Sequence, residues 1–341
     1  MEERKTDRGI QILRILACFV VFICHFGQRL PLERISEDLY SISQLGAYGV
    51  ELFFVISGYL ACFSLANGKS AVAFYKKRAI RILVLYYFCI LYYFITETFI
   101  FGNIPKDDMG LGWLRYIFCL NGIVPSEGYF WSNLGITWTI PVFLTFYLLA
   151  PLITKITKTT LSSAIAVVVS IAISFLISNK CDGWFSAITY LPCFLMGVLV
   201  YNAKKENLKF ITVFGLQLFV FATKFNEYTR FIELVIRYSQ IFIVSAIFAT
   251  IVLFTEEVKI VKEKTVKVLD ILDEHSYTLY LVHGITFCGI IDKFEINVFS
   301  SLIVAIIFRL VVSIILTAIL TVAIHKYVEK PIQKKLSERL F

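Results

Sequence analysis

Three ionisable residues near the start of the chain lie within stretches that are otherwise apolar. Arg14 and His25 are eleven residues apart in RGIQILRILACFVVFICHF, and Glu51 lies in GAYGVELFFVISGYL. Eleven residues make about three helical turns, or ~16 Å, so both side chains return to nearly the same face. A carboxylate at a depth similar to that of His25 is costly unless it is paired, and the imidazole is its obvious partner. Such a pair is suited to proton transfer near neutral pH.

Two further arginines, in FYKKRAIR, have the spacing of a phosphate clamp. Arg78 and Arg81 are three residues apart, so their guanidinium groups share one helical face and can bind one phosphorylated ligand together. Ordinary cytoplasmic charge in contact with anionic lipid is the alternative for both. Arg14 can likewise be a snorkelling residue, and His25 a polar helix end that faces water. Ser57, in mid-helix, suits close helix packing as well as it suits function.

The composition places these residues in a membrane protein. Of the 341 residues, 58% are hydrophobic and 17% are charged, and the mean hydropathy is +0.76. A soluble domain has roughly 45–50% apolar and about 25% charged residues, so the soluble class is excluded. Disorder, collagen and disulfide scaffolds are excluded as well, because low complexity, glycine repeats and a dense cysteine framework are absent. We expect an all-α integral membrane protein.

The helices that position these residues follow from the length of the apolar runs. A span takes ~20 mostly apolar residues, and ten such runs predict ten transmembrane helices. We expect them to form one transmembrane domain over 1–341, without a fused soluble domain. The run WLRYIFCL near 111–122 is too short to cross and is expected in the interface. The predicted spans lie near 10–28, 45–66, 80–101, 135–154, 161–178, 185–202, 208–223, 236–255, 276–291 and 299–325.

The distribution of basic residues predicts the orientation. With a cytoplasmic N-terminus, 22 of the 33 Lys and Arg residues fall on cytoplasmic segments, eight on outer loops and three within spans. This asymmetry favours an even number of spans with both termini cytoplasmic. It also accounts for the net charge of +8, so nucleic-acid binding is not expected.

The eight cysteines predict neither a metal centre nor a disulfide framework. Most lie within apolar runs, where a free cysteine behaves as a small hydrophobe. The sequence has no CxxC pair and no Cys/His spacing of a metal site, so no metal is expected. Cys119 and Cys181, near predicted outer loops, are a minor candidate for a disulfide.

Several segments together resemble the membrane-bound acyltransferase-3 family, whose members modify carbohydrates at the cell surface. The specific marks are Arg14 with His25, GVELFFVISGY (49–59) and FYKKRAIR (74–81). Weaker marks are YLPCFLMG, SYTLYLVHG and VEKP, the last of which is expected to stop the helix at the inner membrane surface. The marks occur in family order from residue 8 to residue 331, so the resemblance covers nearly the whole chain.

The resemblance implies about ten helices in the plasma or inner cell membrane and the transfer of an acyl group to a glycan hydroxyl. The donor is usually cytoplasmic acetyl-CoA, and the acceptor is a cell-surface or exported glycan or a lipid-linked saccharide. By resemblance His25 is the catalytic histidine, and Arg14, Arg78 and Arg81 belong to the donor site, to which we add Ser57.

These assignments give a hypothesis for the mechanism. The CoA phosphates dock on Arg78 and Arg81 with help from Arg14, and the pantetheine arm carries the thioester to His25. His25 acts as the base for the sugar hydroxyl, and Glu51 orients the imidazole. His25 can instead carry the acyl group, and Glu51 can face a different partner.

One position departs from the family pattern. Many members carry a Trp-Ser-Leu-x-x-Glu segment in a middle helix, whereas WTIPVFLTFYLLAP has Phe143 where that Glu falls. This puts the acceptor in doubt. The outer loops 29–44 and 102–134 are expected to shape acceptor choice, because loops on a rigid scaffold carry specificity.

Other functions are compatible with part of the pattern. A transporter or flippase for a glycan or lipid-linked precursor also has buried charges, but here they cluster in the first three helices and not in two matching halves. A structural scaffold has no need of them. Within the enzyme class, succinyl can replace acetyl, and the acceptor can be a capsule, an exopolysaccharide, a lipid-linked oligosaccharide or a small molecule. The oligomeric state is left open.

Overall fold

The regular structure is helical throughout, and no strand occurs among the residues that the structure describes. The all-α class is therefore confirmed. The computed structural model describes residues 7–30, 32–66, 68, 70–102, 112–121, 132–178, 187–230, 233–260, 262–291 and 301–340.

The helices follow the apolar runs of the sequence in order. Short 3-10 or π-helical turns adjoin many of them: η1 (Leu32–Arg34), η2 (Leu45–Tyr48), η3 (Thr96–Ile100), η4 (Ser132–Trp138), η6 (Thr255–Glu257), η7 (Ile285–Ile290) and η10 (His325–Glu329). The α-helices are α1 (Arg8–Gln28), α2 (Glu37–Gln44), α3 (Gly49–Ala66), α4 (Ala71–Ile95), α5 (Gly112–Ile117), α6 (Thr139–Ile156), α7 (Thr160–Ser178), α8 (Ala187–Lys205), α9 (Lys209–Thr229), α10 (Glu233–Leu253), α11 (Glu263–Gly284), α12 (Leu302–Ile324) and α13 (Lys330–Leu340).

Seven helical segments in the described part of the chain are long and apolar enough to cross a membrane. They coincide with the first six predicted spans and with the tenth. The other three predicted spans fall on α9, on α10, which contains the shorter apolar helix Tyr238–Leu253, and on α11 with η7. A multi-pass membrane protein is confirmed, whereas the count of ten and the cytoplasmic termini stay predictions.

The region before the second span differs from the sequence prediction. The predicted outer loop 29–44 contains the helix α2, which begins after the cap residue Ser36. The side chain of Ser36 accepts a hydrogen bond from the Leu39 backbone N–H at 3.3 Å, which satisfies one of the unpaired donors of the first turn. The α-helix α3 begins at Gly49 and not at 45, so Glu51 lies in its first turn.

The basic segment and the C-terminal segment also differ from the prediction. The helix α4 begins at Ala71 and not near 80, so Arg78 and Arg81 lie on the same helix. The expectation that VEKP stops a helix is wrong, because η10 leads directly through Pro331 into α13. A widened π-helical turn before a proline accommodates its ring and its missing N–H.

The chain divides into two compact units. The first comprises Met1–Arg14, Val50–Tyr75 and Val142–Asp270. The second comprises Ile15–Gly49, Lys76–Pro141 and Ile271–Phe341.

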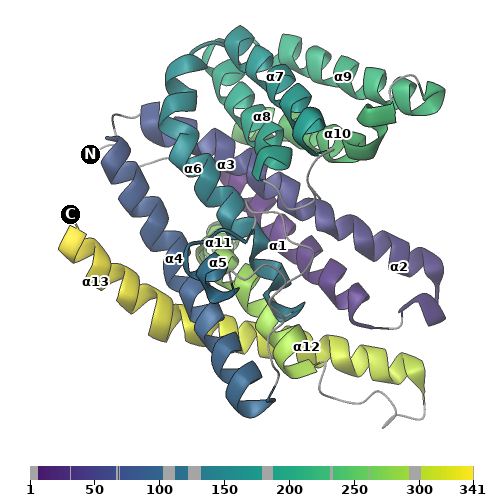
Figure 1. The fold of residues 1–341 in the computed structure, drawn as a ribbon, viewed down its shortest axis with the longest axis vertical. Helices are drawn as coiled ribbons and strands as arrows, with labels where there is room; N and C mark the ends of the chain where they lie inside the picture. The colour runs from purple at the N-terminus through teal and green to yellow at the C-terminus, as the bar shows by residue number, and fades with distance from the viewer. Residues whose placement is uncertain are drawn as a thin grey trace. The chain divides into compact units, whose positions relative to one another are not determined.

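In the first unit, helices pack in pairs: α7 with α8, α8 with α10, and α10 with α9 (Figure 1). Two glycines bring α3 and α8 together. A Cβ at Gly58 would lie 2.0 Å from the Phe194 carbonyl oxygen, and a Cβ at Gly197 would lie 2.0 Å from the Val55 carbonyl oxygen. Glycine therefore permits a backbone approach that no larger residue allows.

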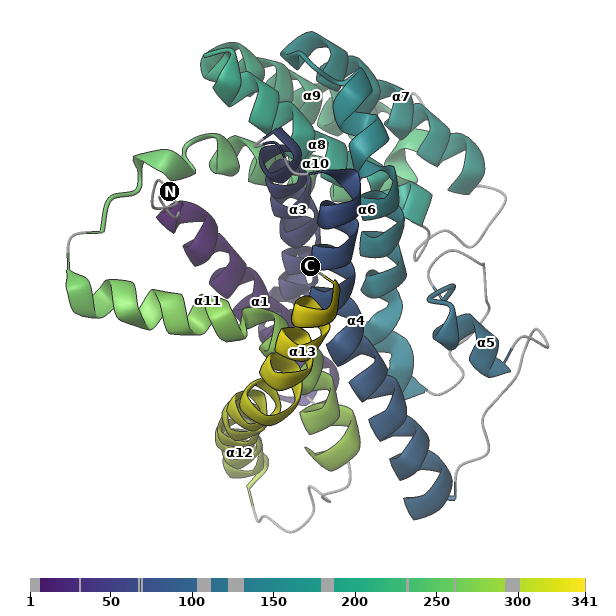
Figure 2. The ribbon, with the colours of Figure 1, turned by 90° about the vertical axis from the view of Figure 1, so that its left-hand side faces the viewer.

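In the second unit, α12, η10 and α13 form one continuous helical run, drawn in yellow-green to yellow (Figures 1 and 2). An apolar core joins side chains of α1, η7 and α12. It consists of Phe22, Phe26, Leu30, Phe287 and Ile306. This core fixes the end of α1 that carries His25.

Candidate active site

The second unit brings His25 of α1 against His283 of α11. Their imidazole rings are stacked, with centroids 5.1 Å apart and planes inclined by 27°. His283 is 1% exposed, whereas His25 is half-buried. Two imidazoles thus lie face to face, one buried and one half-buried.

The hydrogen bonds of the pair assign the proton on each neutral ring. His25 Nδ1 lies 2.9 Å from Gln28 Oε1, and His283 Nδ1 lies 3.3 Å from the Leu279 carbonyl oxygen. Both partners are oxygens that only accept, so each Nδ1 donates and each Nε2 keeps its lone pair. The Nε2 of His283 has no hydrogen-bond partner among the described residues. The pair therefore presents two Nε2 lone pairs.

A polar network holds Gln28 in place. Its Nε2 donates to Gln44 Oε1 at 3.0 Å, and Gln44 Nε2 donates in turn to Ser43 Oγ at 3.0 Å. The orientation of the His25 ring thus depends on the turn-and-helix segment that replaces the predicted loop 29–44.

Aromatic rings enclose the buried imidazole. Phe287 packs on His283 with a centroid distance of 6.2 Å, and Tyr280 packs at 5.8 Å. Phe22 closes the group through its 5.0 Å contact with Phe287. The hydroxyl of Tyr280 donates a hydrogen bond to Thr139 Oγ1 at 3.2 Å, so the polar atom of this aromatic side chain has a partner.

Glu51 lies in the first unit and has the features of a functional acid. It is 6% exposed, and its Oε2 has no hydrogen-bond partner among the described residues. A buried carboxylate oxygen without a partner is costly and is retained where it has a task. Its predicted pairing with His25 joins residues of different units and stays a prediction.

The other predicted donor residues take different positions. Arg14 is half-buried on α1 and belongs to the first unit. It follows from the unbroken helix that Arg14 and His25 share nearly one face of α1. Ser57 is half-buried in the middle of α3, next to the close approach at Gly58.

Three sequence motifs meet around the predicted donor arginines in the second unit. Arg78 is half-buried and Arg81 is exposed on α4. The Arg81 carbonyl accepts a hydrogen bond from Gln333 Nε2 at 3.4 Å, and the Ile82 carbonyl accepts one from the Tyr277 hydroxyl at 3.0 Å. The basic segment is therefore held by the SYTLYLVHG helix and by α13, which follows VEKP.

Glu329, in the VEKP motif, is a buried acid that joins these segments through hydrogen bonds. It is 4% exposed and accepts hydrogen bonds from Thr278 Oγ1, from His325 Nδ1 at 2.7 Å and from Gln333 Nε2 at 3.0 Å. Sequence reasoning missed the roles of Glu329 and His283. Both lie in motifs that were recognised. For His283 the sign was an imidazole within an apolar run, whereas Glu329 lies among charged residues and had no such sign.

The departure at Phe143 has a structural counterpart in the first unit. Phe143 packs against Phe54 at 4.9 Å, Phe194 at 5.6 Å and Tyr147 at 6.1 Å between ring centroids. An aromatic cluster therefore surrounds the position at which the sequence resemblance leads us to expect an acid.

The proposed disulfide is not tested. Cys119 is a buried free thiol within the described residues, and Cys181 lies outside them.

Comparison with known proteins places these features in a family. The family profile described as "Acyltransferase domain" (acyltransferase-3) matches residues 7–322. Nodulation protein 10 of Rhizobium leguminosarum bv. viciae is 27% identical over 181 residues, which cover 43% of this chain and 44% of that protein. Acyltransferase MdmB of Streptomyces mycarofaciens is 24% identical over 146 residues, which cover 41% of this chain and 37% of that protein.

The chain thus spans less than half the length of these curated relatives. No solved structure matches it. The family match includes both rings of the histidine pair, Glu51 and the two arginines of α4. Since the match extends over nearly the whole sequence, this chain belongs to the acyltransferase-3 family.

Proposed function

We propose that this protein is an O-acyltransferase of the cell membrane that moves acetyl from cytoplasmic acetyl-CoA to a hydroxyl of a cell-surface or exported glycan. The observation that supports it most is the His25–His283 pair, which offers Nε2 lone pairs beside an enclosed aromatic wall. The name of one relative, acyltransferase MdmB, agrees with this reaction class.

The chemistry assigned to the pair is general-base catalysis at His25. A sugar hydroxyl is a poor nucleophile at neutral pH, so Nε2 of His25 takes its proton as the oxygen attacks the thioester carbonyl. The carbon–sulfur bond then breaks, and the imidazolium returns the proton to the departing thiolate. His283 holds the ring of His25 face to face, and Glu51 stabilises the imidazolium in the full hypothesis.

The donor is proposed to bind through its phosphates. Arg78 and Arg81 offer guanidinium groups on the same helix, one half-buried and one exposed. Charge-assisted, bidentate hydrogen bonds to phosphate suit such a pair. Arg14 and Ser57 complete the proposed donor site, and the pantetheine arm is long enough to cover the ~16 Å between Arg14 and His25 on α1.

The test is the O-acetyl content of surface glycans, measured by mass spectrometry. The strains carry the wild-type protein, the His25→Ala variant or no protein, and immunoblotting of the membrane fraction verifies equal amounts of the two proteins. We expect acetyl only with the wild-type protein, and the acceptor is identified in the same spectra. Equal acetyl content in all three strains contradicts the proposal.

Two alternatives have distinct outcomes. An O-succinyltransferase of the same family adds the mass of succinyl instead of acetyl. A glycan or lipid-linked precursor transporter gives unmodified glycans whose export depends on the protein and on an ion gradient.

A further inference from the structure

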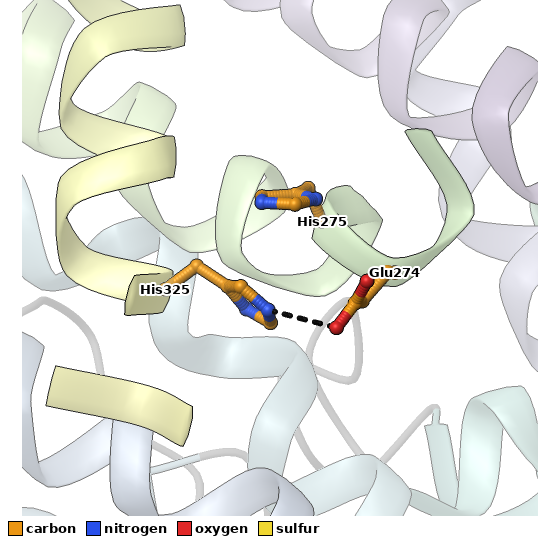
Figure 3. A group of neighbouring side chains, drawn as sticks. All are labelled: Glu274, His275 and His325. Carbon is orange, nitrogen blue, oxygen red and sulfur yellow. Dashed lines mark hydrogen bonds and ion pairs between the residues drawn. The ribbon is translucent and has the colours of Figure 1, made fainter. Parts of the chain in front are cut away.

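All four histidines of the chain occur as two pairs within the second unit, and α11 contributes one ring to each. The second pair is His275 with His325, whose ring centroids are 4.3 Å apart. Glu274 adds a carboxylate, with its Oε1 3.3 Å from His325 Nε2 (Figure 3). One ligand atom from each of Glu274, His275 and His325 lies within 4.8 Å of the other two.

Each ring is anchored through Nδ1 in the way that metal-binding histidines are. His275 Nδ1 lies 2.7 Å from the Ile271 carbonyl oxygen, and His325 Nδ1 lies 2.7 Å from Glu329 Oε2. A carbonyl or carboxylate oxygen that accepts the Nδ1 proton fixes the tautomer and leaves Nε2 as the ligand atom. The two rings therefore already have the tautomer that an ion requires.

The contact of His325 with Glu274 needs a positive charge between its two atoms. A neutral His325 that donates from Nδ1 directs the lone pair of Nε2 at a carboxylate oxygen 3.3 Å away. Two acceptors that face each other repel unless a proton or a metal ion lies between them. Zinc bonds of roughly 2.0–2.1 Å place tetrahedral ligand atoms about 3.3 Å apart, which matches this pair, and the ligand atom of His275 lies within 4.8 Å of both.

The anchor on His325 is built into the protein interior. Glu329 is 4% exposed and is held by Thr278 and Gln333. Carboxylate–histidine–metal triads of this kind orient the ring and strengthen it as a ligand.

We propose that Glu274, His275 and His325 form a divalent metal site that binds Zn²⁺ and ties α11 to the end of α12. Two imidazole nitrogens and one carboxylate oxygen form a ligand set that zinc accepts, and the fourth coordination position is left for water. The site is separate from the proposed acyl transfer, which uses the other two histidines. Glu274 and His325 are 51 residues apart along the chain, so no motif spacing could predict it.

One nearby cation competes with the ion. Lys330 Nζ lies 3.0 Å from the same Glu274 Oε1. Its side chain is 68% exposed, so it can turn into water at little cost when a metal arrives. Removing it is therefore expected to tighten metal binding.

The experiment measures metal content and affinity with the full-length protein in detergent. The protein is stripped with a chelator, titrated with Zn²⁺ by calorimetry and analysed for bound metal by mass spectrometry. The variants are His275→Ala, Glu274→Gln, His325→Ala and Lys330→Ala, with His283→Ala as a matched histidine control from the same helix. Size-exclusion profiles verify folding, and His275→Ala tests the site even when His325→Ala, which removes one of the three hydrogen-bond donors to Glu329, fails to fold. Titration with Co²⁺ reports tetrahedral geometry through its visible absorption.

We expect one Zn²⁺ per wild-type chain and an unchanged stoichiometry in His283→Ala. His275→Ala should lose at least ~100-fold in affinity and Glu274→Gln at least ~10-fold, while Lys330→Ala should bind several-fold tighter. Zn²⁺ should raise the Tm of the wild type and leave that of His275→Ala unchanged. Absence of binding by the wild type, equal binding by His275→Ala, or loss of binding in His283→Ala overturns the proposal.

Discussion

His25 and His283 stack with ring centroids 5.1 Å apart, and each donates its Nδ1 proton to an oxygen of its own helix. The consequence is that both neutral rings carry the lone pair on Nε2. A basic nitrogen on the half-buried ring and a second, fully buried imidazole behind it form a unit suited to moving one proton.

Replacing either ring should therefore lower acyl transfer. We expect His25→Ala to reduce kcat by about 10²–10⁴-fold, the range of general-base catalysis. His283→Gln should reduce kcat less, because His25 keeps its own hydrogen bond to Gln28. The measurement is transfer from radiolabelled acetyl-CoA by purified protein, with Lys334→Ala, an exposed change on α13, as control. An unchanged kcat in His25→Ala would show that the pair is not the base.

Removing a donor arginine should affect donor binding more than turnover. We expect Arg81→Ala to raise the KM for acetyl-CoA by about 10–100-fold, since a charge-assisted hydrogen bond contributes roughly 1.5–3 kcal/mol. Lys77→Ala removes the same charge from an exposed position of the same helix and serves as the matched control. Equal KM values for Arg81→Ala and Lys77→Ala would mean that general positive charge, and not a clamp, attracts the donor.

The close approach of α3 and α8 should be intolerant of any side chain. Gly58→Ala places a Cβ 2.0 Å from the Phe194 carbonyl oxygen, so we expect it to cost about 2–3 kcal/mol of stability. Gly215→Ala on α9 is the control, because its Cβ meets no atom within 4 Å. Thermal unfolding in detergent should show a lower Tm for the first variant only. Equal Tm values would refute the packing argument.

Introducing the acid that the sequence resemblance leads us to expect at position 143 should damage this protein. Phe143→Glu puts a carboxylate among the rings of Phe54, Phe194 and Tyr147, and an unpaired buried charge costs several kcal/mol. We expect less folded protein in size-exclusion chromatography, while Phe143→Leu keeps it. Higher acyl transfer by Phe143→Glu would contradict this interpretation.

A charge pair in the first unit should make stability depend on pH. Hydrogen bonds from Gln11, and then from Arg8, whose Nη1 lies 2.5 Å from Asp270 Oδ1, hold the pKa of Asp270 below its usual value. Because the pKa of Asp270 is lowered in the folded protein, the stabilisation that the pair provides is fully present above pH ~4, the ordinary pKa of Asp. This stabilisation is lost as the pH falls through the lowered pKa of Asp270. The Tm difference between wild type and Asp270→Asn should therefore shrink on acidification. A Tm difference that does not change with pH would contradict this role of the Arg8–Asp270 pair.

Much of the fold followed from local properties of the sequence. The apolar runs predicted the positions of the membrane helices, because burial in lipid acts on each run of ~20 residues separately. The boundaries at α2, α4 and α13 were missed, since caps and π-helical turns depend on single residues and on packing. Pro331 shows this most clearly: its type predicted a helix end, and the widened turn before it removed the reason for one.

For the candidate site, the sequence by itself determined that His25 and Arg14 share a face of one helix, because helical period is a local quantity, and it predicted a costly position for the Glu51 carboxylate, which is buried. Only the tertiary structure decided which histidines meet. His25 stacks on His283, and His275 on His325, across segments that are distant in sequence and joined by helix packing. Such partners depend on the summed contacts of whole helices, which no short pattern of residues encodes.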